Sequence, residues 1–283
     1  MYRHQVSFKI KSLMDAMALP LYRMRGGIPW SLGYYTAKKR AIERAIERQA
    51  VLPGRNLEPG FGIALDERVV EYPWIFGHLA ASVQPKCRIL DAGSILNHDF
   101  LLNKSPVKES DLTIMTLAPE KYCQWYDGFS YVYGDLRRTY FGEGVFDVVI
   151  CVSTIEHIGL DNSLLYADQR HAERDEAGYL SAARELRRII RRGGTCYISF
   201  PFGLRQNLGW YQVFDEPMVD RLIEAFNPSA HEVEYFGYSE SGWQRADPLA
   251  LANATVFDVH SGAGRGNDRA ASSRAIACLR LTA

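Results

Sequence analysis

Glu156 and His157 are adjacent and directly follow the apolar run of residues 146–152. An imidazole titrates close to neutral pH, so a histidine at this place is suited to removing a proton from a hydroxyl group. Glu156 would orient that imidazole or act as the base itself. The structural alternative is that His157 caps a helix while Glu156 pairs with a surface arginine. The pair therefore leaves two interpretations open, a catalytic base or a helix cap with a surface ion pair.

Several other polar or small residues also follow short apolar runs. They are Asp91, Gly93, Ser94, Glu120, Asp135, Leu136 and Ser153. In open α/β sheets, ligands bind beyond the carboxyl ends of the strands. These residues are therefore candidates for a ligand site, although Asp91 and Asp135 would also serve as turn caps and Ser153 as a partner of the backbone.

Three aromatic residues are candidates for contact with a substrate. Trp210 and Tyr211 follow the run of residues 195–200, and Trp243 lies further along the chain. Tryptophan and tyrosine stack on sugar or aromatic rings and keep a polar tip. Packing against the edge of a sheet explains the same residues equally well.

The elements that must position these residues are short strands alternating with helices. Strands are expected at residues 88–91, 112–117, 130–133, 146–152, 195–200, 233–236 and 275–281. Apolar residues recur at helical spacing over 172–192, where Gly193 and Gly194 are expected to end the helix, and a second helix begins at Asp215. This alternation predicts a mostly parallel seven-stranded α/β sheet with helices on both faces. It covers residues 86–283 and follows an N-terminal helical appendage over residues 1–85.

Three ordered motifs in this region resemble those of class I S-adenosylmethionine-dependent methyltransferases, in particular the type 11-like group. The first is Ile-Leu-Asp91-Ala-Gly93, and the second joins Tyr-Gly-Asp135-Leu-Arg to the run that ends in Ser153-Thr-Ile-Glu-His157. The third is the passage from residue 185 through the two glycines to Pro201. The resemblance implies a Rossmann-like fold and S-adenosylmethionine as cofactor.

The resemblance also implies a role for each residue at a strand end. Asp91 would order the first loop, while Gly93 and Ser94 would lie beside the cofactor. Glu120 would hold the ribose hydroxyls, and Asp135 with Leu136 would contact the adenine. Ser153 would lie near the methionine moiety. The first hypothesis for the function is therefore transfer of the methyl group to a hydroxyl of a small molecule or glycan, with His157 or Glu156 as the base.

The first loop departs from the acid-x-Gly-x-Gly-x-Gly pattern of that family, because it reads Asp91-Ala-Gly93-Ser-Ile95-Leu-Asn97. A β-branched residue such as Ile95 adopts a positive φ only at a high cost, whereas Asn97 does so at a modest one. The alternative function is therefore a non-catalytic, methyltransferase-like binding or scaffold module. A dinucleotide-dependent enzyme is disfavoured, because the Gly-x-Gly-x-x-Gly fingerprint does not follow the first strand.

Composition excludes several classes of protein. Lys plus Arg equals Asp plus Glu at 33 each, so no overall charge recruits nucleic acid. The five cysteines form no Cys-x-x-Cys pair and no cluster with histidines, so a metal site is not expected. Neither a membrane-spanning run nor a signal-peptide pattern is found, so a cytoplasmic location is expected.

The N-terminal region is the exception to this even charge. Residues 1–50 hold ten Lys or Arg and three acids, which gives 10 − 3 = +7. A basic amphipathic helix is expected at residues 7–19, and such helices lie on anionic membranes. Packing on its own domain or on a dimer partner is the alternative, and the oligomeric state is left open.

Overall fold

The computed structural model describes residues 14–120 and 123–283 and divides them into two compact units. The first unit comprises the N-terminal part up to Gly77 together with Gly237–Arg245 and Thr255–Arg274. The second comprises His78–Phe236, Ala246–Ala254 and Ala275–Ala283. These units do not follow the expected boundary between residues 85 and 86, because two C-terminal segments belong to the first unit. The expected division into an appendage over residues 1–85 and a domain over residues 86–283 stays a prediction.

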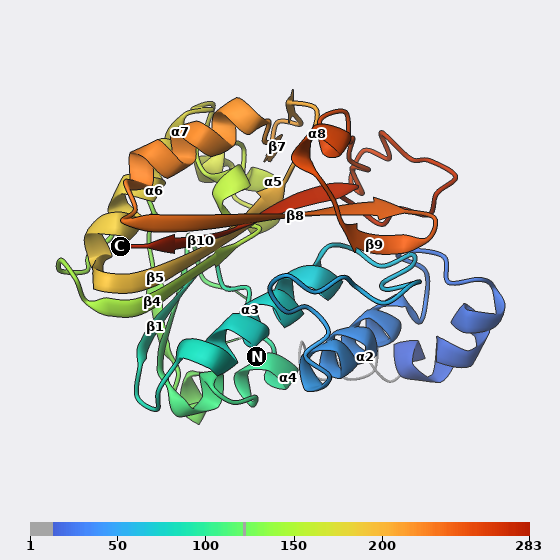
Figure 1. Cartoon of the computed structure of the whole chain (residues 1–283), viewed down its shortest axis with the longest axis horizontal. Helices are drawn as coiled ribbons and strands as arrows, with labels where there is room; N and C mark the ends of the chain where they lie inside the picture. The colour runs from blue at the N-terminus through green and yellow to red at the C-terminus, as the bar shows by residue number, and fades with distance from the viewer. Residues whose placement is uncertain (1–13, 121–122) are drawn as a thin grey trace. The chain divides into compact units, whose positions relative to one another are not determined.

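The main sheet has eight strands in the order β3-β2-β1-β4-β5-β10-β8-β9 (Figure 1). Their bounds are β1 Arg88–Ala92, β2 Asp111–Thr116, β3 Ser130–Tyr133, β4 Phe146–Val152, β5 Ile190–Pro201, β8 Ala230–Ser239, β9 Gly242–Arg245 and β10 Ala275–Thr282. Strands β1 to β5 pair with one another in parallel, whereas β10 runs antiparallel to β5. The order 3-2-1-4-5 is that of a doubly wound, Rossmann-like sheet. The expected fold class is confirmed, and β9 adds a strand beyond the seven predicted.

Two amphipathic helices, α6 (Gly178–Ile189) and α7 (Glu216–Phe226), pack together along one face of the sheet (Figure 1). Their buried residues share one core with alternate residues of β1, β4, β5 and β10. Asp215 caps α7 as expected, since its carboxylate accepts the N–H of Met218 at 3.0 Å. The opposite face of β5 carries Tyr197, which contacts His78 and Ser82 in the last part of α3 (Arg68–Ser82). The sheet of the second unit thus has helices on both faces.

The expected end of the long helix is wrong by several residues. Helix α6 ends at Ile189, and β5 already begins at Ile190. Gly193 and Gly194 lie inside β5, where the pairing with β4 jumps from Phe146–Ile190 to Val148–Thr195. Gly193 has φ +73°, and a side chain at residue 194 would collide with the carbonyl of Asp147. The two glycines therefore serve a bulge in the strand and do not cap the helix.

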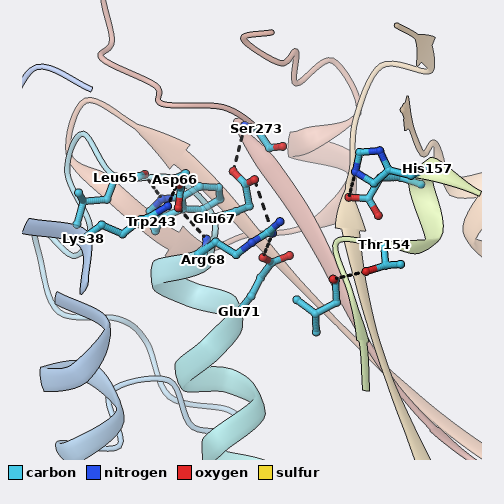
Figure 2. A network of polar contacts seen from close by, with 12 residues as sticks. Lys38, Leu65, Asp66, Glu67, Arg68, Glu71, Thr154, His157, Trp243 and Ser273 are labelled. Carbon is cyan, nitrogen blue, oxygen red and sulfur yellow. Dashed lines mark hydrogen bonds and ion pairs between the residues drawn. The ribbon is translucent and has the colours of Figure 1, made fainter. Parts of the chain in front are cut away.

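In the first unit, residues 14–24 are helical and α2 spans Tyr34–Glu47. Residues 7–13 of the expected N-terminal helix lie outside the described residues. Asp66, just before α3, accepts a hydrogen bond from the Tyr34 hydroxyl at 2.9 Å. It also accepts one from Lys38 Nζ at 2.7 Å (Figure 2). These bonds tie α2 to the start of α3.

The remaining short elements are α4 Asp99–Leu102, η1 Val107–Glu109, η2 Trp125–Asp127, η3 Ile155–His157, α5 Ser163–Tyr166, η4 Gln169–His171, β6 Gln206–Asn207, β7 Gln212–Val213 and α8 Pro248–Leu251. Within the described ranges, no helix is long and apolar enough to cross a membrane. All five cysteines are free thiols; Cys151, Cys196 and Cys278 are buried, whereas Cys87 and Cys123 are only partly buried.

Candidate functional site

The loop after β1 is organised by the side chain of Asp91. This carboxylate is fully buried and accepts the backbone N–H groups of Ile95 at 3.1 Å and of Leu96 at 2.8 Å. Burial raises the pKa of Asp91 to about 7, although the two N–H groups act in the opposite direction. Asp91 thus orders the turn in the way that its predicted role requires.

Gly93 and Ser94 are the two residues of this loop with positive φ, at +126° and +65°. The Gly93 N–H donates to the Met115 carbonyl of β2 at 2.8 Å. A Cβ at Gly93 would overlap the side chain of Thr154, so only glycine fits beside the segment that follows β4. Ile95 does not adopt a positive φ and its side chain is buried. The loop therefore takes another path, in which Ser94 and not Asn97 takes the left-handed conformation.

Ser94 is the residue of this loop with an unused polar atom. Its Oγ is buried and has no hydrogen-bond partner within the part of the chain that the structure describes. A buried hydroxyl without a partner is costly, and a ligand or a water molecule normally satisfies it. Ser94 Oγ is thus available for a hydrogen bond with a ligand or a water molecule at the end of β1.

Glu120 lies beyond the end of β2 and reaches the first loop. Its Oε2 accepts from Asn97 Nδ2 at 3.2 Å, and Asn97 Oδ1 accepts from the Tyr131 hydroxyl of β3 at 2.8 Å. The Tyr131 oxygen in turn accepts the backbone N–H of Gln124 at 2.8 Å. This chain of bonds joins the ends of β1, β2 and β3 and holds a carboxylate among them.

Asp135, at the end of β3, is already bound by a cation. Both of its oxygens accept from Arg137, with Arg137 Nη2 at 2.6 Å from Oδ2, and Arg137 also pairs with Glu173. Burial tends to raise the pKa of Asp135, but the hydrogen bonds from Arg137 outweigh it and lower the pKa below its usual value. Leu136 is buried in the core of the sheet. Asp135 is therefore paired with Arg137, and Leu136 packs in the core of the sheet.

The end of β4 supplies the fourth part of the site. Ser153 has φ +40°, and its N–H donates to the Ser199 carbonyl of β5 at 2.9 Å. The following Thr154 hydroxyl donates to the Val152 carbonyl at 2.9 Å (Figure 2). The strained backbone at Ser153 turns the chain away from the sheet into η3, which carries Glu156 and His157.

His157 is held in one orientation by the segment after β5. Its Nδ1 lies 2.8 Å from the Trp210 carbonyl, and the ring lies against Trp210 and Tyr211. Because a carbonyl only accepts, Nδ1 carries the proton and Nε2 is the nitrogen that takes up another. Nε2 lies 3.9 Å from Oε1 of the buried Glu156. A base with a fixed tautomer next to a carboxylate is suited to proton removal from an acceptor.

The three aromatic candidates do not share one site. Trp210 is half-buried and stacks edge-on against the buried Tyr211, beside His157. Trp243 is fully buried in the first unit, where its indole N–H donates to the Leu65 carbonyl at 3.0 Å (Figure 2). Its apolar ring and its N–H are both satisfied inside that unit, so the structure gives Trp243 a packing role in place of the expected contact with substrate.

Sequence reasoning missed three residues that the structure places at this edge of the sheet. They are Asn97 as a bridge to Glu120, Tyr131 as its support, and Thr154 as the neighbour of Gly93. The alternation along β3 was the available signal for Tyr131, since alternate side chains of a strand share one face. No group of metal-binding side chains occurs over residues 14–120 and 123–283.

No family model and no curated protein matches this chain. Among solved structures, it is similar to the Burkholderia thailandensis 1,6-didemethyltoxoflavin-N1-methyltransferase with bound 1,6-didemethyltoxoflavin and S-adenosylhomocysteine, at 15% identity and a TM-score of 0.43, covering 72% of this chain and 74% of that one. It is also similar to the N-methyltransferase NodS from Bradyrhizobium japonicum, at 12% identity and a TM-score of 0.42, covering 87% and 96%. The [4+2]-cyclase SpnF is similar at 13% identity and a TM-score of 0.42, covering 71% and 75%. At these values the comparisons assign no activity to this chain.

Proposed function

We propose that the second unit binds S-adenosylmethionine at the ends of β1, β2 and β4 and transfers its methyl group to a hydroxyl of a small molecule or glycan. The observation that carries the proposal is that Gly93 of the first loop contacts both strand β2 and the segment after β4. Its N–H bonds to Met115 of β2, and its Cα faces Thr154 after β4. The carboxylate of Glu120 is bonded into the same first loop through Asn97. Several implied cofactor residues therefore meet at the edge where α/β sheets bind ligands.

The residues present fit such a cofactor chemically. Ser94 Oγ is buried without a partner in the described chain and offers a hydrogen bond to a polar ligand. The carboxylate of Glu120 is an acceptor suited to the paired hydroxyls of a ribose. Asp91 acts indirectly, because it fixes the backbone of residues 95 and 96 and so shapes the loop. Ser153 stays the candidate nearest the methionine moiety.

S-adenosylmethionine, when bound, supplies a methyl group on a positively charged sulfur, so positioning of the acceptor provides much of the rate. For a hydroxyl acceptor, His157 Nε2 takes the proton while the Trp210 carbonyl holds Nδ1–H and the ring orientation. The adjacent Glu156 carboxylate stabilises the imidazolium that results. We expect Trp210 and Tyr211, whose rings contact His157, to contact the acceptor as well.

The first experiment is isothermal titration of the full chain with S-adenosylmethionine and with S-adenosylhomocysteine. Micromolar binding of both is expected, and it should weaken in the Ser94→Ala variant because the orphan hydroxyl is lost. The exposed Ser241→Ala variant is the matched control and should bind as tightly as the wild type. Absence of heat and of any thermal shift at millimolar ligand would overturn the proposal.

The second candidate is a non-catalytic, methyltransferase-like binding or scaffold module. The observation that favours it is the state of Asp135, whose two oxygens are already occupied by Arg137 and which therefore has fewer positions left for an adenine amino group. The same titration distinguishes the two functions. Binding with micromolar affinity supports the enzyme, and its absence supports the module.

A further inference from the structure

The helix formed by residues 14–24 is apolar on two opposite faces. Leu19 and Tyr22 are buried in the first unit, and Asp15 on the same side accepts the N–H groups of Gly33 at 2.6 Å and Thr36 at 2.7 Å. The other side presents Met14, Met17, Leu21 and Met24, which we name the methionine face. Their spacing of three and four residues places these side chains in one row along the helix.

The methionine face is exposed to an unusual degree for such side chains. Met17 is 75% exposed and Met24 is 80% exposed. Further exposed apolar side chains follow in the sequence, namely Ile28, Leu32 and Tyr35, together with the less exposed Trp30. A single exposed apolar residue needs no explanation, but four exposed apolar side chains in one row of a helix mark a surface that contacts another molecule or a membrane.

Exposed basic residues accompany this face. Arg23 and Arg25 lie at the end of the helix, and Lys39, Arg40, Arg44 and Arg48 are exposed on and after α2. Over residues 14–48 there are seven Lys or Arg and three acids, which gives 7 − 3 = +4. Asp15 is one of those acids and is buried, so the exposed surface of this segment is still more positive.

We infer that the methionine face and its flanking arginines form a docking surface for an anionic lipid membrane. Methionine and leucine side chains enter the acyl region, arginines contact the acidic headgroups, and Trp30 and Tyr35 suit the boundary between the two. The basic charge supplies an attraction of the required sign, because each Lys or Arg near an anionic leaflet adds to the binding free energy.

A second copy of this chain fits the surface less well. A twofold contact would bring two copies of the same basic segment together, so the net positive charge of residues 14–48 would oppose its own copy. A folded protein partner would need a shaped groove for the protruding methionines, whereas a lipid layer accepts side chains that project from a single helix. The inference does not depend on the proposed methyl transfer.

The test is co-sedimentation of the full chain with two kinds of vesicle, phosphatidylcholine alone and phosphatidylcholine mixed with phosphatidylglycerol. Binding to the mixed vesicles is expected to exceed binding to the neutral ones and to weaken as salt is raised. The Met17→Ser/Met24→Ser variant should bind at least tenfold more weakly. The Arg23→Gln/Arg25→Gln variant should lose about thirtyfold, as expected for two cations near an anionic surface.

The control is Leu249→Ser, because Leu249 is 77% exposed but lies in α8 of the second unit. It should sediment with the mixed vesicles as the wild type does, and thermal melts should show that all variants fold. Equal binding to both vesicles, or to neither, overturns the inference. A dimer seen by sedimentation equilibrium that the methionine variant abolishes, without vesicle binding, assigns the face to a second copy instead.

Discussion

Asn97 Nδ2 donates to Glu120 Oε2 over 3.2 Å, which joins the loop after β1 to the segment after β2. The two residues are 23 positions apart, and the hydroxyl of Tyr131 on β3 fixes the other end of the Asn97 amide at 2.8 Å. This bond brings the carboxylate of Glu120 to the first loop although a proline and extra residues separate it from the strand.

Replacement of Glu120 by glutamine should weaken S-adenosylmethionine binding about tenfold or more, because a charged acceptor of hydrogen bonds is lost. Isothermal titration measures the effect. The matched control is Glu109→Gln on η1, whose exposed carboxylate accepts the hydroxyl of the nearby Ser105 at 3.0 Å. Equal affinity of the Glu120 variant and the wild type would remove Glu120 from the cofactor site.

The His157→Ala variant should lower methyl transfer by about a hundredfold or more and leave cofactor affinity unchanged, since its imidazole acts on the acceptor. Release of S-adenosylhomocysteine in the presence of hydroxyl-bearing acceptors provides the rate, and titration provides the affinity. His231→Ala, at an exposed position on β8, is the control histidine variant. An unchanged rate for His157→Ala would exclude the histidine from the mechanism.

The pH dependence of stability should report on Asp91. Burial raises its folded pKa to about 7, above the value near 4 of an unfolded chain, so the folded state binds the proton more tightly. Asp91 therefore disfavours the folded state increasingly as pH rises from about 4 to 7, by up to roughly 4 kcal/mol in the free energy of unfolding.

The Asp91→Asn variant has no titrating group at this position. The difference in the free energy of unfolding, variant minus wild type, should therefore increase as the pH rises from about 4 to 7. Urea denaturation at several pH values measures the difference between the two proteins. Other carboxyls, including Glu67 with a pKa raised by burial to about 7, contribute to both curves and cancel in the difference. Parallel curves for the two proteins would show that Asp91 keeps its ordinary pKa.

Most of the sheet could be predicted from the sequence because its strands are short apolar runs between turns. All seven expected strands are present, and their order brings Asp91, Gly93, Glu120 and Ser153 to neighbouring strand ends. The sequence pattern does not predict helix α3. This helix contains Pro73, which usually interrupts a helix, and its apolar residues lie on all sides and so lack the spacing of an amphipathic helix.

The errors concern residues whose role depends on distant partners. Gly193 and Gly194 follow an arginine-rich helix, which is the local pattern of a helix end, but the pairing of β5 with β4 decides their conformation. Asp135 matches its motif, yet the preference of Arg137 for both carboxylate oxygens is visible only in three dimensions. The non-glycine residue of the first loop with a positive φ is Ser94, since Asp91 accepts the N–H groups of Ile95 and Leu96 that follow it.

The Gly93→Ala variant should be destabilised by more than the strain of a positive φ alone. A Cβ at Gly93 would overlap the Thr154 side chain, whereas a Cβ at Gly128, which also has a positive φ of +90°, would meet open space. Gly128→Ala should therefore cost about 1–2 kcal/mol, and Gly93→Ala should cost clearly more. Thermal unfolding of both variants measures the difference. Equal losses would mean that Thr154 does not restrict residue 93.

Trp243→Phe should lower the stability of the protein and leave S-adenosylmethionine binding unchanged. The indole is fully buried in the first unit and donates to the Leu65 carbonyl at 3.0 Å, so phenylalanine removes buried volume and leaves that carbonyl without this donor. A loss of about 1–3 kcal/mol in the free energy of unfolding is expected from the lost hydrogen bond. The control is Trp125→Phe, whose half-exposed ring should change stability by less than about 0.5 kcal/mol. Weaker ligand binding of Trp243→Phe at unchanged stability would contradict this prediction and would indicate that Trp243 contacts the substrate.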